Sequence, residues 1–240
     1  KTWGGGFFHD GTYSSFRGEN WGMPVPEAVP SWRFVEFAQD HDQIGNRAAG
    51  DRLSQSLSYD RLAVAAVLTM TAPGTPMLFM GEEWGASTPW QFFTSHPEPE
   101  LAEAVRSGRK AEFAAMGWDE SVVPDPNDPA TFQRSTLDWA EAAEGDHARL
   151  LALYRSLARL RRERAELTDS HRAGHAAESA GPGRWLLHRG AATVWINLSA
   201  EPWRIDIASG DTVWLATEEV AVPGGLVLPP DAAAVVGPPA

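Results

Sequence analysis

The 240-residue sequence contains no cysteine, which excludes disulfide bonds, thiolate zinc sites and a cysteine nucleophile together. It also has no apolar run of membrane-spanning length, and no signal-peptide pattern is visible in its first residues. Positive charge is scarce, since 20 basic residues stand against 32 acidic ones, a formal net charge of −12. Nucleic-acid backbones and anionic membranes would be repelled by this charge. We therefore expect a cytoplasmic protein with a neutral partner.

An initiator methionine is also missing, because the chain begins at Lys1 and continues directly into Trp3 and a run of glycines. We expect from this that the sequence is a fragment of a longer protein. The chain has 11 tryptophans, whose indole rings pack well on the apolar faces of sugars. Tryptophan also fills protein cores, so the count alone only suggests a carbohydrate ligand.

The first part of the chain has the pattern of a parallel α/β architecture. Residues 1–33 are rich in glycine, proline and aromatics, which predicts loops with short elements. A buried strand is predicted over 34–38, a helix over 59–71 that ends at Pro73-Gly74, and a second short strand over 77–80. Both predicted strands lead into polar segments, as in proteins that alternate strands and helices.

The rest of the chain changes from helical to strand periodicity. Helical stretches are expected over 98–116, interrupted at Gly108, and over 146–167, with a proline-rich excursion over 122–138. A polar linker covers 171–183. Alternation then predicts strands at 185–188, 193–198, 203–207, 212–216 and 232–236. We therefore expect two domains, 1–170 and 171–240, the second being all-β.

Two polar segments that follow predicted strands are candidate sites. Asp42 and His41 come just after the first strand, where α/β barrels place their catalytic groups. On periodicity alone, a helix-capping aspartate beside a hydrogen-bonded histidine is the favoured interpretation. Glu82, Glu83 and Trp84 follow the second strand, and solvated acids in a loop are the alternative there. Four aromatic residues nearby form either a platform for a sugar or a cover over the top of a barrel: Trp84, Trp90, Phe92 and Phe93.

Four blocks of sequence carry a resemblance to a known family. The segment Gln39-Asp-His-Asp-Gln-Ile-Gly-Asn-Arg-Ala48, with Gly50-Asp-Arg-Leu53, resembles the fourth motif of the α-amylase family of glycoside hydrolases, in its trehalose-releasing form. The flanking blocks agree with the same family, and they are Phe8–Gly18, Leu78–Pro89, and Arg106–Phe113 with Pro124–Trp139. The agreement covers roughly residues 7–165. Chance agreement of four ordered blocks is remote.

The resemblance implies the C-terminal portion of a (β/α)8 TIM barrel followed by a small all-β sandwich domain. It further implies hydrolysis, with retention, of the α-1,4 bond next to the trehalose end of an α-glucan oligosaccharide. By motif match, Asp42 is the acid that stabilises the transition state, and His41 contacts the sugar at the cleavage site. Further substrate contacts are expected from other residues of the matching blocks: Gln43, Arg47, Glu83, Trp84, Tyr13, Phe16 and Arg17.

The same resemblance leaves two catalytic carboxylates unaccounted for. The family's nucleophile and general acid belong to motifs that would precede Lys1, so we expect this chain to need the missing N-terminal half of the enzyme. Asp40 stands where the family more often has Asn. On an extended segment, residues 40 and 42 would share one side and their carboxylates would repel each other. We expect no cofactor. We also expect no metal, because the two histidines with the four-residue spacing of a metal pair, His171 and His175, lie in a polar linker that contains Gly174.

Other interpretations stay open from sequence. One is a different enzyme of the α-amylase family, such as a glucan branching enzyme or an amylase. Another is a non-catalytic carbohydrate-binding fragment that uses tryptophans of the β domain. Four tryptophans lie in its predicted strands and are more simply core residues: Trp185, Trp195, Trp203 and Trp214.

Overall fold

The computed structural model describes residues 1–222 and 225–239, apart from the side chains of Glu120, Ala221 and Val222. The chain divides into two compact units. The first unit comprises residues 1–37, 63–77 and 152–240, and the second comprises 38–62 and 78–151. Among the described residues, no helix is long and apolar enough to cross a membrane.

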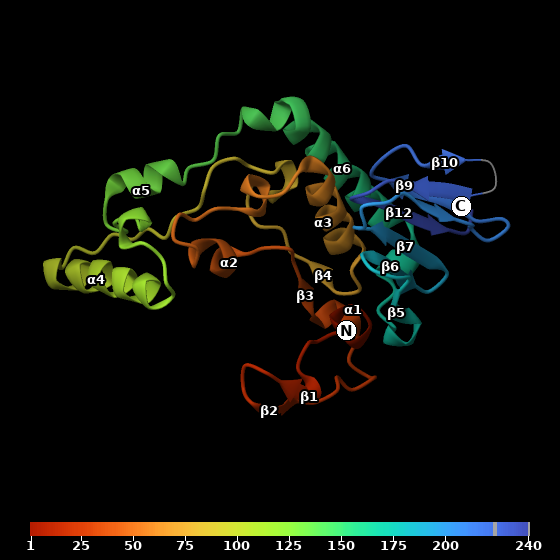
Figure 1. Ribbon diagram of the computed structural model, residues 1–240, viewed down its shortest axis with the longest axis horizontal. Helices are drawn as coiled ribbons and strands as arrows, with labels where there is room; N and C mark the ends of the chain where they lie inside the picture. The colour runs from red at the N-terminus through yellow and green to blue at the C-terminus, as the bar shows by residue number, and fades with distance from the viewer. Residues whose placement is uncertain (223–224, 240) are drawn as a thin grey trace. The chain divides into compact units, whose positions relative to one another are not determined.

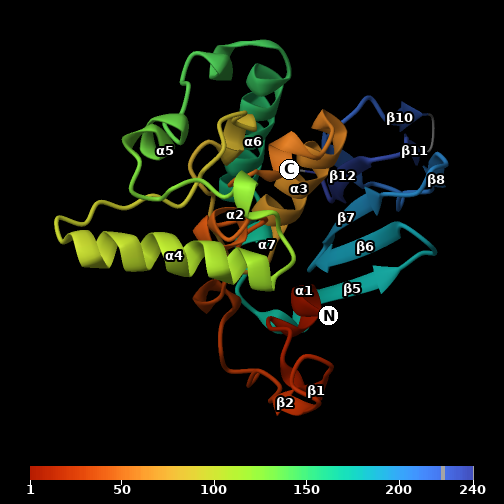
Figure 2. The same ribbon diagram turned by 60° about the vertical axis from the view of Figure 1, so that its left-hand side comes forward.

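Seven α-helices occur in the described residues: α1 (Thr2–Gly5), α2 (His41–Gly45), α3 (Tyr59–Thr71), α4 (Pro99–Ala115), α5 (Pro129–Arg134), α6 (Gly145–Glu163) and α7 (Ala165–Thr168). Figure 1 labels α1 to α6 along the chain. The single-turn 3-10 helices are η1 (Ser31–Arg33), η2 (Leu53–Gln55), η3 (Glu82–Trp84), η4 (Glu120–Val122), η5 (Glu141–Ala143) and η6 (Arg172–Gly174). The predicted helix at 59–71 is confirmed with the same bounds. The helix expected around Gly108 is continuous through that residue as α4, as Figure 2 shows.

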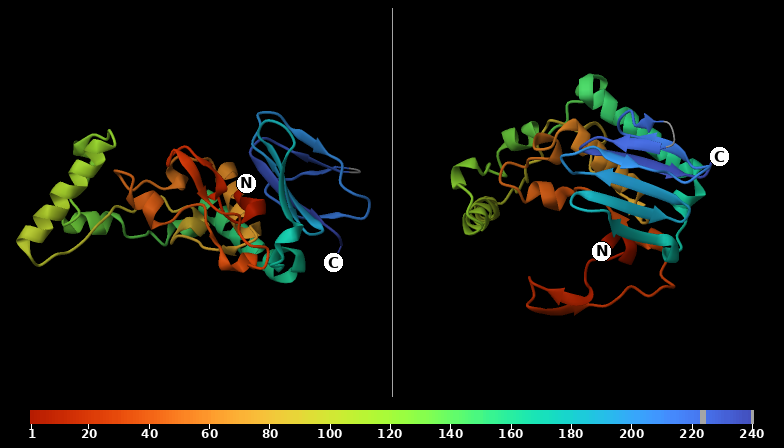
Figure 3. Two further views of the ribbon diagram at one scale, coloured as in Figure 1. Left: turned by 90° about the horizontal axis from the view of Figure 1, so that it is seen from below. Right: turned by 45° about the vertical axis from the view of Figure 1, so that its right-hand side comes forward.

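The strands are β1 (Asp10–Ser14), β2 (Glu19–Gly22), β3 (Val35–Glu36), β4 (Thr75–Pro76), β5 (His175–Ser179), β6 (Arg184–Arg189), β7 (Ala192–Asn197), β8 (Trp203–Ile205), β9 (Thr212–Ala216), β10 (Ala221–Val222), β11 (Gly225–Leu228) and β12 (Ala232–Gly237). One antiparallel sheet contains five strands in the order β5, β6, β7, β12 and β9. Figure 3 shows these strands side by side. Strands β10, β11 and β8 form a second, three-stranded antiparallel sheet.

The core of the β region forms from alternating apolar residues, as its sequence pattern predicts. Leu226, Leu228 and Ala234 are fully buried, and they belong to a cluster that includes residues of β8, β11 and β12. Trp195 and Trp203 pack against this cluster with ring centroids 5.3 Å apart. These two partly buried rings are therefore used in packing against the core, in agreement with the simpler interpretation. Trp214 donates its indole N–H to the Pro238 carbonyl at 2.9 Å.

Two expectations about strands need correction. The predicted strand at 77–80 is not a strand; the parallel pairing joins Val35 to Thr75 and Glu36 to Pro76. One more bond follows, from Met77 N to Glu36 O at 2.9 Å, and beyond it β3 has ended, so the apolar run has no strand to pair with. The polar linker at 171–183 contains the edge strand β5, whose mostly exposed small and polar residues gave no alternating signal.

The helical stretch expected over 146–167 forms as α6 followed by the short α7, and α6 has one apolar face. Leu150, Tyr154, Leu157 and Leu160 are buried, at the three- and four-residue spacing that places side chains on one helix face. In the first unit, Arg161 of α6 donates to the carbonyl oxygens of Met70 (2.9 Å), Ala72 (2.7 Å) and Gly74 (2.7 Å). The Met70 carbonyl lies in the last turn of α3, where helix carbonyls lack a partner within the helix, and the other two carbonyls lie in the segment that follows.

A buried histidine–arginine pair lies where β5 pairs with β6. Arg189 donates from Nη1 to His175 Nε2 at 2.9 Å and from Nη2 to the Leu167 carbonyl at 2.7 Å. Because Nε2 accepts this bond, the imidazole is neutral with its proton on Nδ1. Burial and the neighbouring Arg189 charge lower the pKa of His175 to about 4. Burial likewise lowers the pKa of Arg189 to about 10.

This pair predicts a loss of stability in mild acid. The unfolded chain binds a proton at His175 below its ordinary pKa of about 6.5, whereas the folded chain does so only near pH 4. The His175 contribution to the free energy of unfolding is therefore complete above about pH 6.5 and falls as the pH approaches 4. We expect His175→Gln, whose amide oxygen can accept from Arg189, to flatten this dependence. Urea unfolding of both proteins between about pH 7.5 and 5 measures it; parallel curves would contradict the assignment.

Candidate active site

The segment that carries the candidate acid is a short helix with a complete N-terminal capping box. The Asp40 carboxylate accepts from Asp42 N at 2.7 Å and from Gln43 N at 3.4 Å. In return, the Gln43 side-chain oxygen accepts from Asp40 N at 3.1 Å. These bonds satisfy backbone groups that the first turn of a helix leaves free. The segment is therefore helical from His41, and the argument that placed residues 40 and 42 on one side of an extended strand is wrong.

The capping box shows that Asp42 is not the capping aspartate of this segment. A capping aspartate is present, but it is Asp40, so Asp42 has its carboxylate in the first helical turn without that role. Its Oδ1 lies 3.3 Å from His41 Nε2, and both side chains are mostly exposed, at 69% and 67%. The pair places a carboxyl group and an imidazole side by side at an exposed position. Gln43, in contrast, uses its amide oxygen in the cap.

An aromatic group surrounds the first turn of α2. The His41 ring meets Trp90 edge to face at 6.5 Å between centroids, and Trp90 contacts Phe79 at 5.5 Å and Phe93 at 6.2 Å. Gly45 makes this arrangement possible, because a Cβ there would lie 2.5 Å from Trp90 Cζ3. We refer to His41, Asp42 and Trp90 below as the acid–indole group.

The chain leaving α2 is held by two arginines. Arg47 pairs with Asp51 at 2.5 Å between Nε and Oδ2, and its guanidinium lies 5.8 Å from the Trp118 ring centroid. Arg52 is only 2% exposed, and it donates to the carbonyls of Thr88 at 2.6 Å and Met80 at 2.8 Å. Burial lowers the pKa of Arg52, while the charges of Glu141, Glu82 and Glu83 act in the opposite direction. Sequence reasoning did not identify Arg52, although its place in the Gly50–Leu53 block was a signal.

The expected substrate contact of Trp84 is wrong. Its side chain is only 2% exposed, its indole N–H donates to Glu141 Oε1 at 3.0 Å, and its ring packs on Trp139 at 5.1 Å. A ring buried on both faces cannot stack on a sugar. The Glu141 carboxylate also accepts from Ser87 N and Oγ at 3.0 and 2.6 Å. Burial raises the pKa of Glu141, but these hydrogen bonds outweigh it and the net pKa is lowered. Glu83, by contrast, is half-buried on η3.

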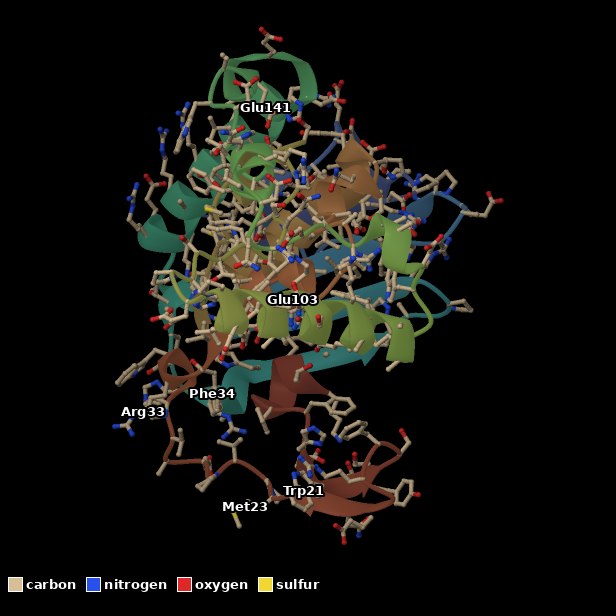
Figure 4. All side chains as sticks on the ribbon, turned by 90° about the vertical axis from the view of Figure 1, so that its left-hand side faces the viewer. Trp21, Met23, Arg33, Phe34, Glu103 and Glu141 are labelled. Atoms are coloured by element: carbon tan, nitrogen blue, oxygen red, sulfur yellow. The ribbon has the colours of Figure 1, made fainter. Side chains whose placement is uncertain are left out.

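The remaining candidates lie on the β1–β2 hairpin of the first unit. Tyr13 is exposed, and Phe16 in the turn is 90% exposed. The Arg17 guanidinium lies over the Trp21 ring at 4.0 Å from its centroid and reaches Phe16 at 6.0 Å. Figure 4 marks Trp21 and Met23 on this segment. The hairpin belongs to the first unit and the acid–indole group to the second.

No metal-ligand cluster of three or more histidine or acidic side chains occurs among the residues that the structure describes. Asp42 and His41 bring a carboxyl group and an imidazole to the start of α2. A carboxylate can stabilise positive charge that develops on a neighbouring group.

No protein-family model matches the sequence. The chain is 57% identical over 234 residues to a malto-oligosyltrehalose trehalohydrolase of Brevibacterium helvolum, which covers 96% of this chain and 40% of that protein. A malto-oligosyltrehalose trehalohydrolase of Mycobacterium tuberculosis is 50% identical over 210 residues, covering 87% of this chain and 36% of that protein. The chain is a relative of malto-oligosyltrehalose trehalohydrolases. It spans about 40% of the length of the first of these trehalohydrolases.

Solved structures give the same relationship at the level of the fold. A putative alpha amylase from Salmonella typhimurium superposes with a TM-score of 0.84 at 33% identity, covering 98% of this chain and 40% of that one. An alpha-amylase from H. orenii, at 19% identity and a TM-score of 0.52, shares the fold over 86% of this chain. The predicted resemblance to trehalohydrolases of the α-amylase family is thus confirmed, and the mixed α/β architecture with it.

The capping box gives a direct test of the helical placement of Asp42. We expect Asp40→Ala to lower the free energy of unfolding by about 1 kcal/mol, because two backbone N–H groups lose their acceptor. Asp40→Asn keeps an acceptor oxygen and should lie within a few tenths of a kcal/mol of the wild type. Urea unfolding of the wild type and both variants measures this difference. An equal loss of unfolding free energy in the two variants would show that the charge of Asp40 stabilises the helix and that its capping bonds do not.

Proposed function

We propose that these residues are the C-terminal part of a glycoside hydrolase that releases trehalose from malto-oligosyltrehalose in the cytoplasm. The observation that carries the proposal is the exposed His41–Asp42 pair at the start of α2. The chain that contains this pair is similar to proteins named malto-oligosyltrehalose trehalohydrolase. The proposed reaction cleaves the α-1,4 bond next to the trehalose end. The proposed substrate is neutral, which fits a net charge of −12.

The proposed scaffold is the last portion of a (β/α)8 barrel followed by a β-sandwich domain, divided near residue 170. In support, β3 and β4 pair in parallel with α3 between them in sequence, the repeating unit of such a barrel. A polar segment with His41 and Asp42 follows β3, and the acidic residues Glu82 and Glu83 follow β4 after the apolar residues 77–80, as expected at the end of a barrel where active sites form. The antiparallel sheets of β5–β12 support the second domain.

In the proposed mechanism Asp42 stabilises the oxocarbenium-like transition state by its charge, and His41 hydrogen-bonds a hydroxyl of the sugar at the cleavage point. Trp90 holds the His41 ring and offers an indole beside it. Glu83 and Arg47 add hydrogen-bonding groups, while Tyr13, Phe16 and Arg17 are proposed for the trehalose unit. Gln43 contributes by fixing the helix start rather than by its amide oxygen.

The proposed mechanism needs a carboxylate nucleophile and a carboxylic acid about 5–5.5 Å apart. We propose that both are supplied by sequence outside these 240 residues, which agrees with the 40% coverage of the relatives. The partner of this chain is then the N-terminal half of the same enzyme.

The test is an assay of the enzyme that contains both parts, with maltotriosyltrehalose as substrate and trehalose release as the measurement. Asp42→Asn keeps the shape of the side chain but removes its charge, and we expect kcat to fall by about a thousandfold or more. Asp60→Asn, the matched control, makes the same change at an exposed position of α3 and should leave kcat unchanged. Residues 1–240 alone should release no trehalose. Trehalose release by the Asp42→Asn enzyme at the wild-type rate would refute the proposed role.

The non-catalytic alternative has less support. Trp195 and Trp203 are packed in the core and Trp214 is hydrogen-bonded through its indole. Trp185 alone of the four is exposed, at 44%, and a single ring is a small platform for a glucan chain.

A further inference from the structure

Arg109, a residue distant in sequence from the acid–indole group, is bound to the helix that carries it. From α4, its Nη2 donates to the Gly45 carbonyl and its Nη1 to Asn46 Oδ1 at 3.2 Å. Gly45 is the last residue of α2, and Asn46 is its C-cap. The last carbonyls of a helix have no partner within the helix, and the guanidinium binds one of them. Its positive charge also interacts favourably with the partial negative charge at the C-terminal end of α2.

The guanidinium itself is held from several sides. It lies 4.6 Å from the Phe92 ring centroid and 4.7 Å from that of Phe113, and its side chain is only 14% exposed. Glu112 accepts a further bond from Nη1 at 3.1 Å. Two aromatic contacts and an ion pair fix the position of a planar, rigid group. Its hydrogen bonds to α2 therefore join that helix to an ordered neighbour.

An apolar contact supports the same junction. Phe113, one turn beyond Arg109 on α4, is buried in a cluster with Ala48 and Val123. Ala48 belongs to the chain that leaves α2, and Val123 follows η4. Figure 4 shows α4, marked by Glu103. The exit of α2 is thus contacted by α4 through hydrogen bonds and through packing.

We propose that Arg109 is a positioning residue for His41 and Asp42. The helix α2 has five residues and is about 7.5 Å long, too short to keep its direction by its own hydrogen bonds. The capping box holds its start, and Arg109 holds its end. Losing the second support leaves the end of α2 held by apolar packing alone, so that the helix tilts and moves the Asp42 carboxylate. We call the hydrogen bonds from Arg109 to the end of α2 the clamp. The consequence for the reaction rests on the proposed function, whereas the clamp does not.

The first measurement is amide hydrogen exchange, read by mass spectrometry in the full-length protein. Arg109→Met keeps an apolar side chain between Phe92 and Phe113 but removes every donor. We expect exchange in 41–48 to rise about tenfold or more, while α3 is unchanged. Arg109→Lys keeps one charged donor and should restore part of the protection. Lys110→Met removes one positive charge from the next position of α4, leaves the Arg109 bonds in place, and should match the wild type.

The second measurement is trehalose release from maltotriosyltrehalose by the same variants. A displaced carboxylate weakens the transition state more than the ground state, so Arg109→Met should lower kcat by about ten- to a hundredfold with KM within about threefold. Arg109→Lys should recover part of kcat, and Lys110→Met should keep all of it.

The outcomes separate the two proposals. Unchanged exchange in Arg109→Met, or a change equal to that of Lys110→Met, overturns the clamp. Raised exchange with an unchanged kcat, or with a rise in KM alone, overturns the positioning role. A wild-type enzyme that releases no trehalose, while Arg109→Met still shows raised exchange over 41–48, overturns the proposed function and supports the clamp.

Discussion

The buried guanidinium of Arg52 is the contact on which the second unit depends. A charge out of water is costly unless its donors are bound, and here Nη1 and Nε bind the carbonyls of Met80 and Thr88, at the two ends of the segment that contains η3. The ring of Phe79 lies 5.2 Å from the guanidinium and also contacts Trp90. One side chain thereby connects the exit of α2, the η3 segment and the aromatic group beside His41.

Much of the fold was accessible from sequence because its signals are local. The helix at 59–71 has a long apolar pattern and a Pro-Gly stop, and its bounds were predicted without error. Alternation predicted β6, β7, β8, β9 and β12 of the β region, but not β10 and β11. Failures occurred where structure depends on a partner. Residues 77–80 are as apolar as a strand, yet β3 ends before they can pair, and β5 forms because β6 offers an edge although its own residues carry little pattern.

The candidate site was predictable in part, through the family's motif. Spacing placed His41 and Asp42 correctly after a strand, but it could not show that Asp40 would take the capping role, since that depends on where the helix begins. Trp84 was misassigned because burial is a tertiary property, decided here by Glu141 and Trp139 from more than fifty residues away. Arg109 lies 64 residues from the carbonyl it binds, and no local pattern connects the two.

The absence of a side chain at Gly45 has a consequence for how this region can vary. The indole of Trp90 occupies the space of any Cβ at that position, so every substitution there must displace a ring that touches His41. A randomised library over 41–47 would return glycine at 45 whatever substrate was used for selection. Intolerance at that position reports a packing demand of the scaffold, and it would be misread as a preference for a particular sugar.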